Sequence, residues 1–198
     1  LASPNNPDGL LLPDADLARI LALPLVLVLD EAYVDFSRSS RVGLVAQHEN
    51  LIVLRTFSKW AGLAGLRVGY GVFPAALMPA LWRLKSPYNV NCAAQVAALA
   101  TLKDMDEAQR RVRLLVAERD RLLAEVARLP RLRALPSDAN FLLLDAAEIG
   151  VPTLRPAMEA RGLILRYYGG GLARYVRISV GTPAQNDAVL DVLRSLTP

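Results

Sequence analysis

Short apolar runs that end in polar residues constrain the fold of this chain more than any other feature. The runs "LVLVLDEA" at 25–32 and "LIVLRTFS" at 51–58 both have this form. They are typical of buried strands, and open α/β sheets bind ligands at the carboxyl ends of their strands. "LRVGYGVF" at 66–73 predicts a third strand. Helical stretches are expected between and after these strands, at 14–22, 75–84, 91–103 and 105–128.

The second half of the chain repeats this alternation in a smaller unit. Strands are expected at 140–145, 163–168 and 175–180, with helices at 152–161 and 184–196. Strands that alternate with helices predict an α/β fold throughout. The segment "KSPYNVNC" at 85–92 interrupts the pattern with proline and asparagine, so we place a domain boundary there, between 1–88 and 89–198.

The chain opens with "LASPNNPDG", which has no start methionine and indicates a strand end followed by a turn. This is typical of entry in the middle of a domain. We therefore expect the chain to be the C-terminal part of a longer protein.

Composition narrows the class of protein. The apolar run at 21–29 contains Pro24 and is far shorter than the roughly 20 residues of a membrane-spanning helix. A single cysteine, Cys92, suits a reducing cytoplasm, where we expect the protein to be located. The net charge of +4 does not predict a nucleic-acid partner, because the basic residues at 110–128 alternate with acidic ones, as on a solvated helix face. We expect no metal site, since the one histidine, His48, lies in a polar loop.

Two polar motifs precede the second strand. The "NNPDG" turn contains Asn6, and turns favour these residues for backbone reasons alone. "VLDEAYVDF" places Asp30 and Tyr33 three residues apart at the end of a strand. These two residues are either a helix cap with a packing tyrosine or part of a ligand site.

The stretch "TFSKWAGLAGLR" is the most informative one. Thr56 and Ser58 offer hydroxyl groups at a strand end, and Arg67 offers a guanidinium group, as a phosphate site requires. Lys59 offers a primary amine, and only a primary amine forms a Schiff base with a carbonyl cofactor. The chain has 20 arginines and three lysines, so a lysine at this position gives weak support for chemistry that arginine cannot perform.

A second basic group lies in "LILRYYGGGLARYVRISVGT" near the C-terminus. Arg166 and Arg177 are either ordinary arginines at strand edges or two halves of an anion site.

Taken in order, "NNPDG", "DEAYVDF", "TFSKWAGLAGLRVGY" and "RISVGT" resemble the fold-type I pyridoxal-phosphate-dependent aminotransferases. The resemblance is closest to their histidinol-phosphate branch and covers essentially all 198 residues. It implies that 1–88 is the C-terminal portion of a large cofactor-binding domain with a mixed sheet and flanking helices. Residues 89–198 would be inter-domain helices and a small α/β domain.

The resemblance also implies a role for each motif. Lys59 would be the catalytic residue that holds pyridoxal 5'-phosphate covalently, and Asp30 would keep the pyridine nitrogen protonated. Asn6 and Tyr33 would bond the ring's 3' oxygen. Thr56, Ser58 and Arg67 would bind the cofactor phosphate, and Arg166 and Arg177 would bind the anionic group of the substrate.

Two residues depart from the family pattern, and one segment is missing from it. Asp8 stands where threonine is commoner, and Trp60 follows the lysine where a small residue is frequent. The glycine-rich phosphate loop and the aromatic residue that stacks on the ring would come from an upstream segment, which this chain lacks.

The implied activity is ping-pong transfer of an amino group between histidinol phosphate and 2-oxoglutarate, in histidine biosynthesis, by a homodimer. Partners among nucleic acids or membranes are not expected. Two alternatives share the fold: a threonine-phosphate decarboxylase and an aromatic-amino-acid aminotransferase. A third alternative, of another class, is a cofactor-binding regulatory module without turnover.

Overall fold

The computed structural model describes residues 1–37 and 39–197. Its contacts divide the chain into two compact units. Unit 1 comprises Leu1–Asn5 and Leu11–Val112. Unit 2 comprises Asn6–Leu10 and the chain from Arg113 onward, so the "NNPDG" turn is split between the units. The boundary expected at 88/89 stays a prediction.

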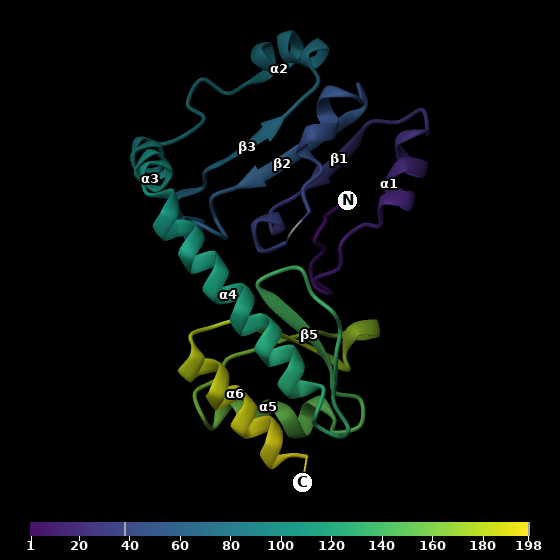
Figure 1. Cartoon of the computed structure of the whole chain (residues 1–198), viewed down its shortest axis with the longest axis vertical. Helices are drawn as coiled ribbons and strands as arrows, with labels where there is room; N and C mark the ends of the chain where they lie inside the picture. The colour runs from purple at the N-terminus through teal and green to yellow at the C-terminus, as the bar shows by residue number, and fades with distance from the viewer. Residues whose placement is uncertain (38, 198) are drawn as a thin grey trace. The chain divides into compact units, whose positions relative to one another are not determined.

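Unit 1 is built on a mixed three-stranded sheet (Figure 1). Strand β1 (Leu27–Asp30) pairs in parallel with β2 (Leu51–Thr56), and β2 pairs antiparallel with β3 (Gly69–Val72). At the other edge of β1, Ala2 forms a parallel bridge with Asp30.

The two faces of this sheet differ because side chains alternate along each strand. Leu29, Leu51 and Val53 are fully buried on one face. They pack with α1 (Asp14–Leu21) and the 3-10 helix Val42–Ala46 through Leu17, Leu21 and Val45. Asp30 follows Leu29 on β1, and Thr56 is an odd number of residues from Val53 on β2. Both side chains therefore point to the opposite face of the sheet, which they share with Leu54, the residue paired with Asp30. The sheet therefore separates an apolar core from the side chains expected to carry the chemistry.

The remaining elements of unit 1 are helical. They are the 3-10 helices Val34–Phe36, Ala64–Leu66 and Ala75–Leu77, the helices α2 (Met78–Leu84) and α3 (Cys92–Lys103), and the first residues of α4 (Met105–Val126). Asn91 starts α3 by accepting a hydrogen bond from the backbone N–H of Ala94, as a helix N-cap does.

Helix α4 has the charged surface that the sequence predicts. Glu107 accepts hydrogen bonds from Arg110 and Arg111, and these bonds lower the pKa of its carboxyl group to about 2. No helix in the described residues is both long and apolar enough to cross a membrane.

Unit 2 contains an antiparallel sheet in the order β4-β5-β7-β6. The strands are β4 (Arg133–Ala134), β5 (Phe141–Asp145), β6 (Arg166–Tyr167) and β7 (Tyr175–Ser179). The helices are α5 (Val151–Glu159), α6 (Pro183–Ser195) and the remainder of α4. Helix α6 begins with a capping box, in which Thr182 and Gln185 satisfy each other's backbone N–H groups.

The helices of unit 2 pack against one face of its sheet. Leu142, Leu144, Val176 and Ile178 lie in one buried cluster with residues of α4, α5 and α6. Phe141, Leu143 and Arg177 alternate with these residues, so they belong to the other face. That face is the one that carries the arginines singled out from the sequence.

The expected α/β class is confirmed, and most expected elements are present. The strand expected at 163–168 is reduced to Arg166–Tyr167, because Leu163 and Leu165 pack against the core outside the ladder. Strand β4 was not expected, since two residues show no periodicity.

We predict that Tyr167→Phe stabilises the protein by about 1 kcal/mol. The Tyr167 hydroxyl is buried and has no hydrogen-bond partner among the described residues, and burial raises the pKa of this phenol. Phenylalanine keeps the ring, on which the Arg155 guanidinium lies at 5.1 Å from the centroid. Urea unfolding measures the change, and a destabilised Tyr167→Phe protein would contradict the prediction.

Candidate active site

The carboxyl ends of β1 and β2 bring Asp30 and Lys59 to one edge of the sheet, because the two strands run parallel. Asp30 ends β1 and is exposed, and its Oδ1 accepts a hydrogen bond of 2.9 Å from the Ala32 N–H. Lys59 lies three residues beyond the end of β2 and is also exposed. Its Nζ lies 5.4 Å from the centroid of the Tyr33 ring.

Lys59 is available for chemistry. Its Nζ makes no hydrogen bond or ion pair within the part of the chain that the structure describes. The backbone around it is held, since Lys59 C=O accepts from the Gly62 N–H and Phe57 C=O accepts from the Leu63 N–H. The turn thus fixes the main chain and leaves the amine exposed.

The antiparallel ladder places Arg67 beside the end of β2. Thr56 pairs with Gly69, and the Phe57 N–H donates to Val68 C=O, so the chain before β3 runs next to the residues after β2. Arg67 has φ +60° at the end of a 3-10 helix, and its Nη1 donates to Ala64 C=O. Thr56 Oγ1 accepts from the Ser58 N–H at 3.0 Å. Thr56, Ser58 and Arg67 therefore come together at the same edge as Lys59.

Trp60 packs into the apolar interior beside this turn. Its ring centroid lies 5.3 Å from that of Phe57, in a cluster that contains Val68, Ala94 and Ala98.

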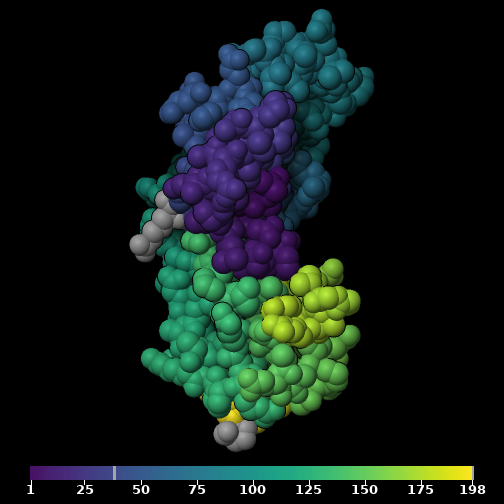
Figure 2. Space-filling model, turned by 90° about the vertical axis from the view of Figure 1, so that its right-hand side faces the viewer, coloured from purple at the N-terminus to yellow at the C-terminus, as the bar shows by residue number. Residues whose placement is uncertain are grey.

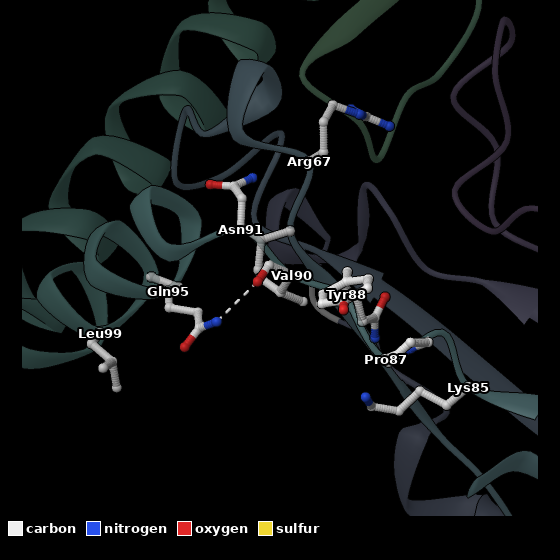
Figure 3. A pocket seen from close by; sticks show the side chains of 11 residues that line it. Arg67, Lys85, Pro87, Tyr88, Val90, Asn91, Gln95 and Leu99 are labelled. Atoms are coloured by element: carbon white, nitrogen blue, oxygen red, sulfur yellow. Dashed lines mark hydrogen bonds between the residues drawn. The ribbon is translucent and has the colours of Figure 1, made fainter. Parts of the chain in front are cut away.

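An open cavity of about 880 Å³ adjoins Arg67 (Figure 3). Lys85, Tyr88 and Asn91 also line it, and Gln95 closes part of its wall by donating to Val90 C=O at 2.9 Å. Arg67 is the one predicted site residue among its lining residues.

A buried ion pair lies on the core face beneath the site and was not expected from the sequence. Glu31 is 1% exposed, and its carboxylate accepts from Arg55 Nε and Nη2 at 3.1 and 3.0 Å. Ser40 Oγ and the Arg41 N–H donate to it as well. The one sequence signal was an arginine inside an otherwise apolar strand.

This ion pair shapes the local electrostatics. Burial lowers the pKa of Arg55, but hydrogen bonds to Glu31 and Tyr70 outweigh it, so that the pKa is raised. Burial raises the pKa of the nearby Asp35 carboxyl, and the charge of Arg55 offsets part of that rise.

In unit 2, Arg166 and Arg177 stand directly opposite each other on β6 and β7. Directly opposed residues share a face of the sheet, and like charges at such positions repel. The glycine-rich segment 169–171, part of the yellow-green region of unit 2 in Figure 2, is exposed beside β6. An anion between the two guanidinium groups would relieve the repulsion.

Arg177 is held by neighbours from distant parts of the sequence. Its Nη1 donates to Asn6 Oδ1 at 2.8 Å, and its guanidinium carbon lies 4.9 Å from the centroid of the Phe141 ring. Its Nε is buried and has no acceptor among the described residues. Asn6 thus joins the arginine group of unit 2.

The predicted residues therefore form two sets. Unit 1 groups the amine of Lys59 with one carboxylate, one phenol, two aliphatic hydroxyl groups and one guanidinium group. These belong to Asp30, Tyr33, Thr56, Ser58 and Arg67. Unit 2 groups Asn6 with Arg166 and Arg177. The first set has the donors for a phosphorylated carbonyl compound, and the second has those for an anion.

Comparisons with known proteins match nearly the whole length of the chain. Residues 1–193 match the family "Aminotransferase class I and II". The chain is 48% identical over 200 residues to a histidinol-phosphate aminotransferase of Roseiflexus castenholzii, covering 99% of this chain and 54% of that protein. The chain thus spans about half the length of the relatives that it matches.

Two solved structures share the fold. The histidinol-phosphate aminotransferase of Clostridium acetobutylicum superposes with a TM-score of 0.90 at 24% identity, over 100% of this chain and 63% of that one. The enzyme of Sinorhizobium meliloti, solved in complex with pyridoxal-5'-phosphate, has a TM-score of 0.84 at 31% identity, over 99% and 57%. The arrangement of the strands and the match along nearly the whole sequence lead to one assignment: this chain belongs to the aminotransferase class I and II family.

Proposed function

We propose that the protein transfers an amino group between histidinol phosphate and 2-oxoglutarate, with pyridoxal 5'-phosphate as its cofactor. One observation carries the proposal: an exposed lysine amine, with no hydrogen bond or ion pair among the described residues, stands at the sheet edge near Asp30, Tyr33, Ser58 and Arg67. The 48% identity to a histidinol-phosphate aminotransferase supports the choice of substrate.

When bound, pyridoxal phosphate supplies an aldehyde that captures amines and a cationic ring that withdraws electrons. The Asp30 carboxylate suits the protonated ring nitrogen, because a charge-assisted hydrogen bond would hold that proton. The Ser58 hydroxyl and the Arg67 guanidinium group suit the phosphate. Thr56 supports Ser58, because its Oγ1 accepts a hydrogen bond from the Ser58 N–H. Asn6 Oδ1 is occupied by Arg177, so the Asn6 amide keeps Nδ2 as a donor for the ring oxygen.

Lys59 would act as both anchor and base. Its amine would attach the cofactor in the resting enzyme and then move a proton from the substrate Cα. The Tyr33 hydroxyl would donate to the same ring oxygen as Asn6. Arg166 and Arg177 would bind the phosphate of histidinol phosphate in one half-reaction and a carboxylate of glutamate in the other, since both anions suit the guanidinium fork.

A homodimer is part of the proposal. Unit 1 exposes large apolar side chains in one stretch of sequence, with Leu84 82% and Tyr88 95% exposed. Helix α3 adds Val96, Leu99 and Leu102. Large apolar side chains exposed in this number are typical of interfaces when they gather on one surface. We also propose a cytoplasmic location, on the ground that a single cysteine leaves no internal disulfide.

The proposed reaction is tested with the full-length product of the gene that encodes this chain. Histidinol phosphate, threonine phosphate and phenylalanine are supplied with the cofactor, and amino transfer and CO₂ release are both measured. Amino transfer from histidinol phosphate supports the proposal. CO₂ release from threonine phosphate would identify a decarboxylase, and cofactor binding with no turnover of any substrate would identify a regulatory module.

We predict that Arg166→Gln raises the KM of histidinol phosphate and of glutamate roughly 10- to 100-fold, because one charge-assisted contact is lost. Arg166 is exposed, so the variant should keep its fold. Arg161→Gln, at another exposed arginine of unit 2, is the control and should leave both KM values unchanged. Equal KM values for Arg166→Gln and the wild type would remove Arg166 from the site.

A further inference from the structure

The turn Asn6–Leu10 is held to the C-terminal part of unit 2 by two hydrogen bonds. Asn6 Oδ1 accepts from Arg177, and Gly9 C=O accepts a hydrogen bond of 2.8 Å from the Asp138 N–H. Neither contact is made by neighbours in sequence. The turn therefore depends on the loop before β5 and on β7 for its position.

Gly9 leaves no room for a side chain unless its surroundings move. It has φ +77°, and a Cβ atom there would lie 2.3 Å from Ser137 Oγ and 2.8 Å from Ser137 Cβ. Distances this short exclude a side chain unless one of the two backbones moves. The turn therefore rests directly on Ser137.

Ser137 cannot rotate away without losing two hydrogen bonds. It is 7% exposed, its hydroxyl donates to Phe141 C=O at 2.5 Å, and its Oγ accepts from the Ala139 N–H at 3.1 Å. Phe141 is the first residue of β5, and its ring lies under the Arg177 guanidinium. Ser137 thus touches the turn on one side and the support of Arg177 on the other.

These contacts form a closed ring of residues. Gly9 rests on Ser137, Ser137 holds Phe141, Phe141 lies under Arg177, and Arg177 donates to Asn6, three residues before Gly9. This cycle of contacts positions the Arg177 guanidinium group from two directions: the hydrogen bond to Asn6 and the face of the Phe141 side chain. The buried Nε still lacks an acceptor among the described residues.

We propose that Gly9 and Ser137 are positioning residues for Arg177, which orient its guanidinium group toward the anionic group of the substrate. This inference rests on the proposed function, since it takes Arg177 as the substrate-binding arginine. Gly9 and Ser137 act through Arg177 and do not themselves touch substrate. They raise the affinity of Arg177 for anions and shield its guanidinium group from reagents in solution.

The first measurement is the binding of glutarate, a dicarboxylate with no amine, to the cofactor-loaded full-length protein by calorimetry. Gly9→Ala should weaken binding at least about tenfold, because displacing the turn removes the Asn6 contact to Arg177. Ser137→Ala removes the hydroxyl without crowding the turn and should weaken binding several-fold. Gly162→Ala is the matched control, with φ +71° and no atom within 4 Å of its added Cβ, and should bind glutarate as the wild type does.

The second measurement does not depend on the substrate. Phenylglyoxal modifies exposed guanidinium groups, and peptide mass mapping gives the rate at Arg177 itself. This rate should rise several-fold in Gly9→Ala and Ser137→Ala and stay at the wild-type value in Gly162→Ala. Thermal unfolding confirms that each variant is folded. If Gly9→Ala does not fold, the comparison of Ser137→Ala with the wild type alone tests the proposal.

The two proposals fail in different ways. A wild-type protein that binds no glutarate contradicts the proposed function, while faster labelling of Arg177 in the variants still supports the positioning role. Folded variants with wild-type labelling and wild-type glutarate affinity would overturn the positioning role.

Discussion

Lys59→Arg is expected to lower the rate of the proposed amino transfer at least about a thousandfold, because in the proposed mechanism the Lys59 amine both attaches the cofactor and moves the proton. Arginine keeps the positive charge but stays protonated and does not replace the amine. Lys59 is exposed, and its Nζ makes no hydrogen bond or ion pair among the described residues, so the fold should be unaffected.

Borohydride reduction and peptide mapping provide the direct readout. In the wild type the reduced cofactor should be found on the peptide that contains Lys59, and in Lys59→Arg on no peptide. Lys103→Arg, at an exposed lysine that ends α3, is the matched control and should keep full activity. A Lys59→Arg protein that transaminates at the wild-type rate would exclude Lys59 as the catalytic residue.

Glu31→Ala is expected to lower the free energy of unfolding by about 3 to 5 kcal/mol, because it leaves a buried positive charge without its partner. Glu31 is 1% exposed, and the Arg55 side chain is 17% exposed. The substitution also removes the acceptor of Ser40 Oγ and of the Arg41 N–H. Urea unfolding at neutral pH measures the loss.

A double variant separates the ion pair from the rest of the contacts. Glu31→Met with Arg55→Met removes both charges and should be more stable than Glu31→Ala, because a well-packed apolar pair of similar size can replace a buried ion pair. Glu107→Ala, which breaks the solvated pairs with Arg110 and Arg111, should leave the unfolding free energy almost unchanged. If Glu31→Ala were as stable as Glu107→Ala, the buried pair would not hold the ends of β1 and β2 together.

The placement of candidate site residues within one short stretch of chain could be predicted from the sequence. Thr56, Ser58, Lys59 and Arg67 were expected at a strand end, and the structure places them at one edge of the sheet. Asp30 was expected at the end of a neighbouring strand, where it lies. Local periodicity and the parallel pairing of buried strands are enough for such predictions.

The partners of buried charges were not predictable. Glu31 next to Asp30 gave no sign of its pairing with Arg55, which lies 24 residues away. The short strand β4 and the shortened β6 escaped for a related reason, since two residues carry no pattern. In each case the deciding contacts are made across the sheet, and the local sequence pattern does not identify the partner.

The sequence by itself determined the α/β class and the two strand ends at or beyond which Asp30 and Lys59 lie. Only the tertiary structure decided that Asn6 belongs with Arg177, 171 residues away, and that Gly9 rests on Ser137. The physical reason is that a strand is specified by its own side chains. A hydrogen bond between distant residues exists only once the intervening chain has folded and brought donor and acceptor within 3 Å of each other.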